Sequence, residues 1–499
     1  MSQCKNYIFR ILIMNIAVVI GLLGSECMVQ ADEKLPVIIS GGGESLSALS
    51  DGDYYTYSSF SEGDSVTVQA EDGGTIHGLY IIWNSPVREW TLETDNGSIL
   101  CGQNGFIHEY IEIKDGTKEA VINIPEGGMS ICDIRIFDSD DIPDNVQRWN
   151  VPCDRADIML IAAHADDDIL FLGGIIPTYG VEENAAIQVV YMSQFWDTAP
   201  VREHEKLDGL WTAGCRNYPV SAGFSDMYSE NIEEARAQYD ENSMTEYIVE
   251  QIRRFKPQVT VTHDFNGEYG HGFHSLTADA VKNALDGAAD AGAYTDSREK
   301  YGVWDVPKAY FHLYGENMIH LDLREPIDGM GGRTALEIAE EAYSMHVSQQ
   351  WCWFYVSDDY QYSCADFGLY KTLVGTDSNN DMLENLKTYE VQEAESREQE
   401  SIEESIAESV RQSEEESIRE SCEESARQSE EERISIEESM SIEKAKEDEQ
   451  AKKRTRNIIV LTVSVGLAVF ITVFASVKAH TSGKKPVKIK RKSRRRHVR

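Results

Sequence analysis

Histidine and aspartate side chains follow the ends of two predicted strands, and these residue types could hold a metal ion. The first segment, DIMLIAAHADDDILFLGG over 157–174, is a short apolar strand followed by one histidine, three consecutive aspartates and a glycine pair. Adjacent carboxylates repel one another, so a compact fold usually keeps such a cluster where a cation or a shared proton relieves the repulsion. A metal site is the first hypothesis, and a solvated acidic turn is its structural alternative.

The second segment, VTVTHDFNGEYGHGFH over 259–274, is a β-branched strand followed by a glycine-rich loop that ends in His271 and His274. Residues 275–285 carry apolar side chains at helical spacing, so a helix is expected after this loop. Two strand-to-helix loops that carry histidine and aspartate can meet at one edge of a parallel sheet. A lone histidine is more often an ordinary structural residue, so the two segments together carry the metal hypothesis.

The pattern of strands predicts a Rossmann-like α/β domain with a largely parallel sheet. Apolar strands at 158–162, 187–191, 259–262 and 309–312 alternate with expected helices. No GxGxxG follows the first strand, which argues against a dinucleotide site. No GxSxG surrounds Ser193, and no cysteine lies near either metal segment, so a serine or cysteine nucleophile is not expected.

Three ordered motifs over about 156–386 resemble those of a known family. AHADDD at 163–168 resembles the AHPDDE signature of the PIG-L/LmbE family of zinc-dependent N-deacetylases, and GHGFH at 270–274 resembles its HxxH motif. Arg202 and Glu205 in VREHE match the family's RxxE helix, and the following segment leads to an aspartate, here Asp226. Two departures stand out: Ala165 replaces a proline, and Asp168 replaces a glutamate and is one methylene shorter.

The resemblance implies that His164, Asp167 and His274 bind the metal. Two imidazoles and one carboxylate leave open positions for water and for a substrate carbonyl, and zinc in such a site can lower the pKa of water to about 7. Zinc is the expected cofactor, and the ligand set is also compatible with Fe²⁺.

The resemblance also implies roles for five further residues. Asp166 would be the general base, while His271 and Tyr269 would polarise the amide oxygen or protonate the departing amine. Arg202 and Asp226 would bind the sugar or an attached anionic group. For Arg202 the structural alternative is an ion pair with Glu205 three residues later on an exposed helix.

The segment 35–145 predicts a separate antiparallel β-sandwich of jelly-roll type. Its runs alternate between apolar and polar residues and are separated by Gly, Asp and Pro turns: SVTVQA, GLYIIWN, EYIEIKD, AVINIP and CDIRIF. The opening LSDGDYYTYSSF resembles galactose-binding modules, which would make Asp51, Tyr54 and Trp83 candidate glycan contacts; a purely structural role is equally open. Candidate disulfides are Cys352 with Cys364 and Cys101 with Cys132.

The ends of the chain predict secretion and a single membrane anchor. Residues 1–31 have the charge, apolar run and small-residue cleavage pattern of a signal peptide. Residues 457–477 contain an uncharged run long enough for a transmembrane helix. The basic tail 478–499 would then be cytoplasmic and would contact anionic lipid rather than nucleic acid. The Glu/Ser-rich tract 391–450, the source of much of the net charge of −40, is expected to be a partly helical or disordered spacer.

Together these features predict a single-pass cell-surface protein with an extracellular, zinc-dependent deacetylase domain. Its substrate would be an N-acetylglucosamine-containing glycan or glycolipid, and this substrate class follows from the family resemblance and the predicted location. The alternative is a surface glycan-binding or adhesion protein whose deacetylase-like domain is inactive.

Overall fold

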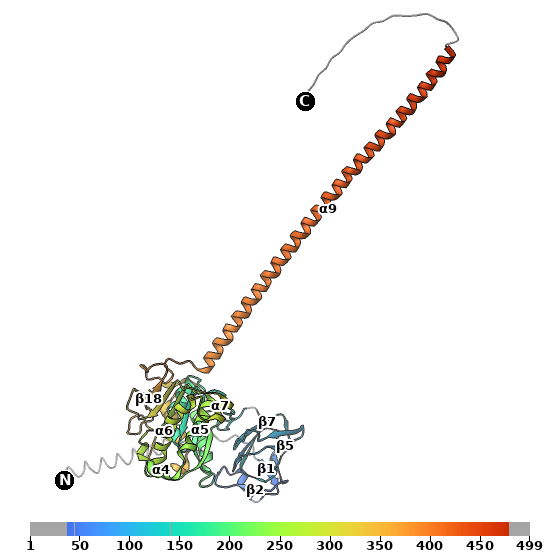
Figure 1. Ribbon diagram of the computed structural model, residues 1–499. Coiled ribbons are helices and arrows are strands. Elements are labelled where there is room, and N and C mark those ends of the chain that lie inside the picture. Colours follow the sequence, from blue (N-terminus) through green and yellow to red (C-terminus); the bar gives the residue numbers. More distant parts are fainter. Residues whose placement is uncertain (1–36, 44, 140, 479–499) are drawn as a thin grey trace, which may run out of the picture. The chain divides into compact units, whose positions relative to one another are not determined.

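The computed structural model describes residues 37–43, 45–139 and 141–478, with side chains described through Val469. The predicted signal peptide and the basic tail beyond Lys478 lie outside these residues, so both stay predictions. The described chain divides after Glu395 into two units, which are treated separately below (Figure 1). The first unit contains all of the predicted site residues.

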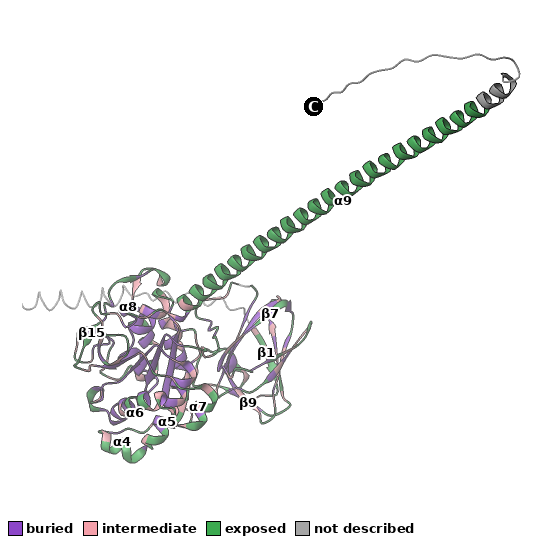
Figure 2. Cartoon of the chain, turned by 45° about the horizontal axis from the view of Figure 1, so that its top comes forward, coloured by how far each residue is buried: buried purple, intermediate pink, exposed green. Residues whose placement is uncertain are grey.

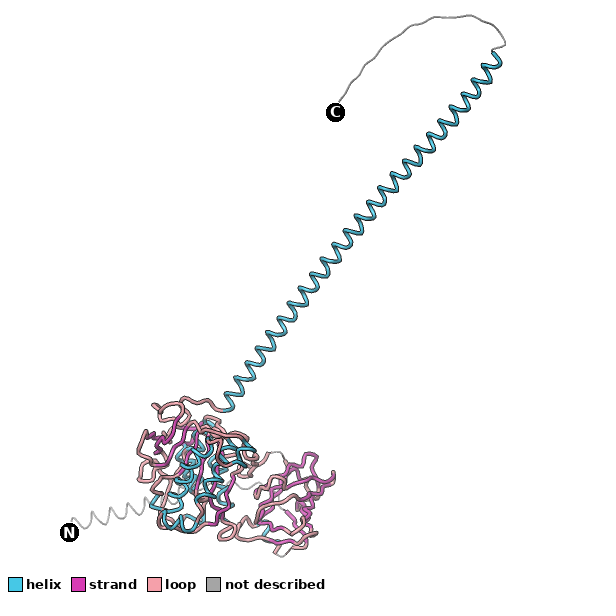
Figure 3. Tube along the Cα trace, in the orientation of Figure 1, coloured by secondary structure: helices cyan, strands magenta, loops and turns pink. Residues whose placement is uncertain are grey.

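The N-terminal part of the first unit is an antiparallel β-sandwich, as predicted (Figure 3). One sheet has the order β1-β3-β8-β5-β6, and the other has the order β2-β9-β4-β7. Along β3 the even-numbered residues 66, 68 and 70 are buried, because alternate residues of a strand point to opposite faces. The strands are β1 (Val37–Gly41), β2 (Ser58–Phe60), β3 (Ser65–Ala70), β4 (Ile76–Trp83), β5 (Trp90–Thr94), β6 (Gly97–Cys101), β7 (His108–Thr117), β8 (Ala120–Asn123) and β9 (Met129–Phe137).

Two of the sandwich's candidate sugar contacts have structural roles. Trp83 is fully buried, and its indole N–H donates to Glu109 at 3.2 Å, so the prediction that it contacts a glycan is wrong. The Tyr54 ring stacks on His204 of the second domain, with ring centroids 4.8 Å apart. Asp51 is exposed and accepts from the Asp53 N–H, which closes a local turn.

A seven-stranded, mostly parallel sheet forms the core of the second domain, with the order β12-β11-β10-β13-β14-β18-β15. The five strands from β12 to β14 are parallel, and β18 and β15 are antiparallel to their neighbours. The chain order reverses between β10 and β13, and in open α/β sheets ligands usually bind at the carboxyl ends of the strands beside such a reversal. The strands are β10 (Ile158–Ala162), β11 (Ile187–Gln194), β12 (Val220–Ser225), β13 (Val259–Thr262), β14 (Lys308–His312), β15 (Met318–His320), β18 (Asp366–Thr372) and a small hairpin of β16 (Pro326–Ile327) and β17 (Arg333–Thr334).

Helices cover both faces of this sheet, which is why its strands are buried on both sides (Figure 2). Even-numbered β10 residues such as Leu160 share a core with α3 and α8, while Met159 and Ile161 pack with α5 and α6. The α8 helix begins with a capping box between Thr334 and Glu337. The helices are α2 (Asp167–Leu170), α3 (Val201–Ala213), α4 (Ile232–Gln238), α5 (Glu241–Phe255), α6 (Gly272–Ala289), α7 (Thr295–Tyr301) and α8 (Ala335–Ser344), with helical turns η1 (Leu46–Ser50), η2 (Ile176–Glu182), η3 (Glu268–Gly270), η4 (Asp328–Met330) and η5 (Val347–Gln349).

The cysteines of the described chain are all free thiols, and neither candidate disulfide is formed. Cys101 and Cys132 are buried separately: the first thiol donates to Ile99 O, and the second contacts Tyr54 O and the Asn84 amide.

The C-terminal unit is a single long helix, α9 (Tyr389–Lys478), which begins at the end of the first unit. The expectation of a partly helical or disordered spacer is therefore wrong for 391–450. The tract has no Gly or Pro, and ion pairs at helical spacing, such as Glu408 with Arg411 and Glu449 with Lys453, support the helix. Its described side chains are exposed throughout from Glu395 onward (Figure 2).

Among the described residues, no helix has an apolar stretch long enough to cross a membrane. The predicted span 457–477 continues past Val469, beyond which side chains are not described. The membrane anchor therefore stays a prediction.

Candidate metal centre

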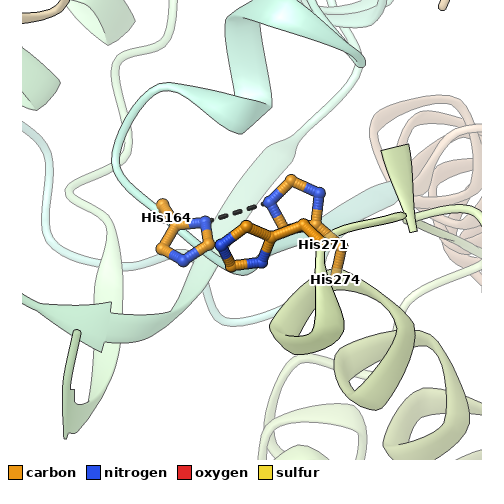
Figure 4. A group of neighbouring side chains, drawn as sticks. All are labelled: His164, His271 and His274. Atoms are coloured by element: carbon orange, nitrogen blue, oxygen red, sulfur yellow. Dashed lines mark hydrogen bonds between the residues drawn. The ribbon is translucent and has the colours of Figure 1, made fainter. Parts of the chain in front are cut away.

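Three predicted ligands meet at the carboxyl ends of β10 and β13. His164 Nδ1 lies 3.0 Å from Asp167 Oδ2. The same nitrogen lies 3.0 Å from His274 Nε2, and His271 lies beside both rings (Figure 4). Asp167 Oδ2 lies 3.3 Å from His274 Nε2, so the three donor atoms form a nearly equilateral triangle. Ligands bonded to tetrahedral zinc at about 2.0–2.2 Å lie roughly 3.3 Å apart, and the triangle fits such an ion with one position left open.

The local backbone explains why these side chains converge. His164 follows β10 by two residues, and its backbone N–H donates to Asp167 Oδ2 at 2.7 Å, which folds the acidic loop back on itself. His274 lies in the first turn of α6, which begins at Gly272. A Cβ atom at Gly272 would lie 2.0 Å from the carbonyl oxygen of Asn231, so only glycine allows this approach.

Two groups of possible ligands occur among the described residues, and they share His274. In each group the three donor atoms lie within 4.8 Å of one another: His164, His271 and His274 form one group, and Asp167, His263 and His274 form the other. His263 Nε2 is 3.5 Å from Asp167 Oδ2, but this nitrogen accepts a hydrogen bond from the Ala163 N–H at 2.8 Å. The His263 lone pair is therefore engaged, and the distances of 3.0 to 3.3 Å among the His164, Asp167 and His274 donors are compatible with the predicted ligand set.

Glu268 is the main residue of the site that the sequence analysis missed. Its buried carboxylate faces the Nδ1 atoms of three imidazoles, those of His274 at 2.7 Å, His263 at 2.9 Å and His312 at 2.7 Å. With Nδ1–H of His274 donated to Glu268, the lone pair of Nε2 is directed at the metal position. Part of this cluster could have been predicted from the sequence. His263 follows β13 and His312 ends β14, and both strand ends lie at the same edge of the sheet.

The charges at this site favour a cation. Burial opposes the charged form of His274, but Asp167 and Glu268 outweigh it and raise the pKa of His274 to about 10. Burial likewise opposes ionisation of Asp167 and Glu268, yet the neighbouring histidines hold both carboxyl pKa values well below their usual range. Two buried carboxylates thus attract positive charge to the point where the triangle of donors lies.

The predicted base and substrate-binding residues form a chain of contacts beside the triangle. Arg202 donates to Asp166 Oδ1 at 3.0 Å and lies 3.9 Å from Asp226 Oδ2. Asp226 Oδ1 is 3.3 Å from His164 Nε2, on the side of the ring that faces away from the triangle. Glu205 instead accepts from the N–H and hydroxyl of Ser348, so the alternative pairing of Arg202 with Glu205 is wrong.

His271 and Tyr269 also lie at the centre. The His271 ring is 4.9 Å from the His164 ring and 4.6 Å from the His274 ring. His271 Nδ1 accepts from the Phe273 N–H at the start of α6, so the neutral ring carries its proton on Nε2. Burial, followed by the neighbouring His274 and His164, lowers the pKa of His271 to about 2. Tyr269 has φ 50°, a strained conformation for a large side chain, and its ring lies 5.5 Å from that of His274.

Asp168, the shortened carboxylate, lies behind the ligands. It is fully buried, and neither of its oxygens has a hydrogen-bond partner among the described residues. Burial, which outweighs a contribution from Tyr191, raises the pKa of Asp168 well above its usual range. All eight predicted site residues therefore come together at one edge of the sheet, while their individual chemical roles stay predictions.

Comparison with known proteins gives a family match over this region. Residues 159–285 match the PIG-L family, described as GlcNAc-PI de-N-acetylase. The chain is 34% identical over 179 residues to 1D-myo-inositol 2-acetamido-2-deoxy-alpha-D-glucopyranoside deacetylase 2 of Saccharopolyspora erythraea, a match that covers 31% of this chain and 64% of that protein. It is also 24% identical over 196 residues to 1D-myo-inositol 2-acetamido-2-deoxy-alpha-D-glucopyranoside deacetylase 1 of Catenulispora acidiphila. This match covers 32% of this chain and 57% of that protein.

Solved structures to which the chain is similar include a deacetylase and the protein CpGH89CBM32-6. The N,N'-diacetylchitobiose deacetylase from Pyrococcus horikoshii is 14% identical with a TM-score of 0.29, over 39% of this chain and 71% of that chain. The module CpGH89CBM32-6 produced by Clostridium perfringens is 19% identical with a TM-score of 0.18, over 21% of this chain and 97% of that chain.

Proposed function

The chain belongs to the PIG-L/LmbE family through the domain that carries the candidate metal centre, and on this premise we propose that it is a metal-dependent N-deacetylase. The observation that carries the proposal is the triangle of His164, Asp167 and His274 donors with the Asp166–Arg202 pair beside it. The proposed substrate is an N-acetylglucosamine-containing glycan or glycolipid, which would lose acetate and keep a free amine. The named activities of the two bacterial relatives support this substrate class.

When bound, the metal would lower the pKa of a water molecule and polarise the acetamide carbonyl. Asp166 would accept a proton from the attacking water, and the Arg202 guanidinium, 3.0 Å from Asp166 Oδ1, would fix the orientation of that carboxylate. The neutral His271, which carries its proton on Nε2, is suited to donate a hydrogen bond to the oxygen that becomes negative. Tyr269 lies beside both histidines and is partly exposed, so its hydroxyl could reach the departing amine.

The proposed location is the cell surface, with the N-terminal domains outside and a single span near 457–477. The uncharged run in this segment, the basic tail after it and the signal-like residues 1–31 support the location. In this arrangement the tract 391–450 would be the spacer between the enzyme domain and the span.

The test is acetate and amine release by the full-length protein in detergent, with zinc or with a chelator. Two substrates are compared. One is a set of N-acetylglucosamine oligosaccharides, and the other is 1D-myo-inositol 2-acetamido-2-deoxy-alpha-D-glucopyranoside, which appears in the name of the relative. Equal amounts of acetate and amine that appear only with metal support the proposal. No release from either substrate by fully metal-loaded protein contradicts it and favours the inactive glycan-binding alternative.

A further inference from the structure

An exposed aromatic segment lies beside the metal centre. Residues 351–355 read WCWFY, and their side chains alternate between exposed and inward positions. Trp351, Trp353 and Tyr355 are 81%, 61% and 53% exposed. Large aromatic rings at such exposure are unusual in a soluble domain, and a cluster of them marks a binding surface.

The inward-facing Phe354 connects this segment to the metal centre through ring contacts. Its ring lies 4.3 Å from that of Tyr269, which in turn lies 5.5 Å from the ring of the ligand His274. Phe354 also contacts Trp353, with ring centroids 4.0 Å apart. Ring contacts therefore run continuously from the ligand His274 through Tyr269 and Phe354 to the exposed Trp353.

A second pair of rings strengthens the same surface. Tyr355 stacks on Tyr360 at 4.5 Å with an interplanar angle of 27°, and Tyr360 meets Tyr362 edge to face at 5.8 Å. Tyr362 lies 6.2 Å from both Trp353 and Phe354. Trp353 and Tyr355 thus belong to a packed aromatic cluster, which lowers the conformational entropy that their side chains lose when a ligand binds, and Trp351 lies next to this cluster in the sequence.

Resting on the deacetylase function proposed above, we propose that Trp351, Trp353 and Tyr355 form a platform on which sugar rings of a glycan chain stack, so that the substrate is an oligosaccharide or polysaccharide. A pyranose ring presents C–H bonds on its faces and hydroxyls at its edge, which suits an aromatic face with polar surroundings. Units next to the acetylated sugar would lie on the platform while that sugar occupies the metal centre.

The charge of the segment favours a glycan over an anionic membrane surface. Residues 347–370 contain no Lys or Arg and three aspartates. Asp358 is paired with Arg324 from outside the segment, whereas Asp359 and Asp366 form no ion pair with a Lys or Arg among the described residues. Anionic lipid attracts basic segments, so this composition opposes binding to such a surface. It is compatible with a neutral glycan and with the amine-bearing product that deacetylation would leave.

The test measures kcat/KM of the full-length protein on N-acetylglucosamine oligosaccharides from the dimer to the hexamer. Wild-type kcat/KM should rise with chain length, and Trp353→Ala and Trp351→Ala should each lower it on the hexamer by about tenfold, mainly through KM. The dimer should be little affected. Trp353→Phe and Trp351→Phe are matched controls that keep a ring and should retain most of the chain-length effect. Both tryptophans are largely exposed, so the alanine variants should fold.

Binding is followed separately by tryptophan fluorescence of metal-free protein titrated with the hexamer. Quenching that Trp353→Ala reduces, without turnover on any substrate, would uphold the platform while the deacetylase proposal fails. Turnover with equal kcat/KM on dimer and hexamer, unchanged in the alanine variants, would overturn the platform and leave the deacetylase proposal standing. Alanine variants that lose activity only toward a glycolipid in vesicles would also overturn it, because the surface would then face lipid.

Discussion

Replacing Glu268 by glutamine should weaken metal binding although Glu268 is not a ligand. Its Oε2 faces Nδ1 of His274 and of His263, and its Oε1 faces Nδ1 of His312. If the new amide NH₂ occupies the Oε2 position, His274 must turn Nδ1 into an acceptor, which places the proton on the metal-facing Nε2. If it occupies the Oε1 position, His274 keeps its tautomer but loses a charged partner that makes the ring more basic.

Either orientation predicts a loss of zinc affinity of about 10- to 100-fold, or roughly 1.4–2.7 kcal/mol. The measurement is competition for zinc against a chromophoric chelator near neutral pH. Glu109→Gln is a matched control, because this sandwich carboxylate also accepts three hydrogen bonds, from Trp83, Trp90 and the Gly102 N–H. The control should keep wild-type zinc affinity. Wild-type affinity in a folded Glu268→Gln protein would refute the reasoning.

Three other predictions concern stability and turnover. Burial, followed by Lys206, lowers the pKa of His204 from 6.5 to about 3. As pH falls below 6.5, the His204 imidazole binds a proton in the unfolded chain but not in the folded chain. The stability that His204 contributes is therefore fully present above pH 6.5, and the free energy of unfolding decreases by about 1.4 kcal/mol per pH unit between pH 6.5 and pH 3. Urea unfolding at about pH 7 and about pH 5.5 should therefore show a smaller pH dependence for His204→Gln than for wild type, and equal dependence would contradict the shift. Removing bound zinc should lower the unfolding free energy by about 2.7 kcal/mol if free zinc had been a hundredfold above Kd, and calorimetry that shows no change on chelation would count against a folded-state metal site. Arg202→Gln should lower kcat by roughly tenfold or more while zinc content stays at wild-type level, because the variant frees the Asp166 carboxylate; a change confined to KM would instead assign Arg202 to substrate binding alone.

Much of the site could be predicted because its residues follow strand ends. His164 and Asp167 lie just after β10, and His274 follows the loop after β13. Apolar runs locate such strands well, and adjacent parallel strands bring the following loops together. The antiparallel sandwich was equally visible, since its strands alternate between apolar and polar residues.

Other features depend on packing that a linear pattern does not record. The link from Glu268 to His263 and His312 joins residues of two separate strand ends, and only the sheet order makes them neighbours. Trp83 in an alternating strand could have faced either solvent or core, and a hydrogen bond to Glu109 accompanies its burial. The strand β12 was missed because its sequence, VSAGFS, contains a glycine and small residues that weaken a strand pattern.

The helix α9 runs through the whole Glu/Ser-rich tract because the helix propensity of its residues outweighs the irregular apolar spacing. The apolar residues drift around the helix and make no steady seam, yet glutamate favours helix and Glu–Arg pairs recur at i and i+3, as for Glu430 with Arg433.

The most direct test of the central claim measures zinc content and acetate release on the same preparations of wild type, Asp166→Asn and His274→Ala. The metal centre with a neighbouring base predicts that Asp166→Asn retains stoichiometric zinc but loses about 100-fold or more in kcat, because the proton acceptor is removed. His274→Ala should lose both zinc and turnover. Wild-type turnover in Asp166→Asn, or full zinc occupancy with activity in His274→Ala, would contradict the account.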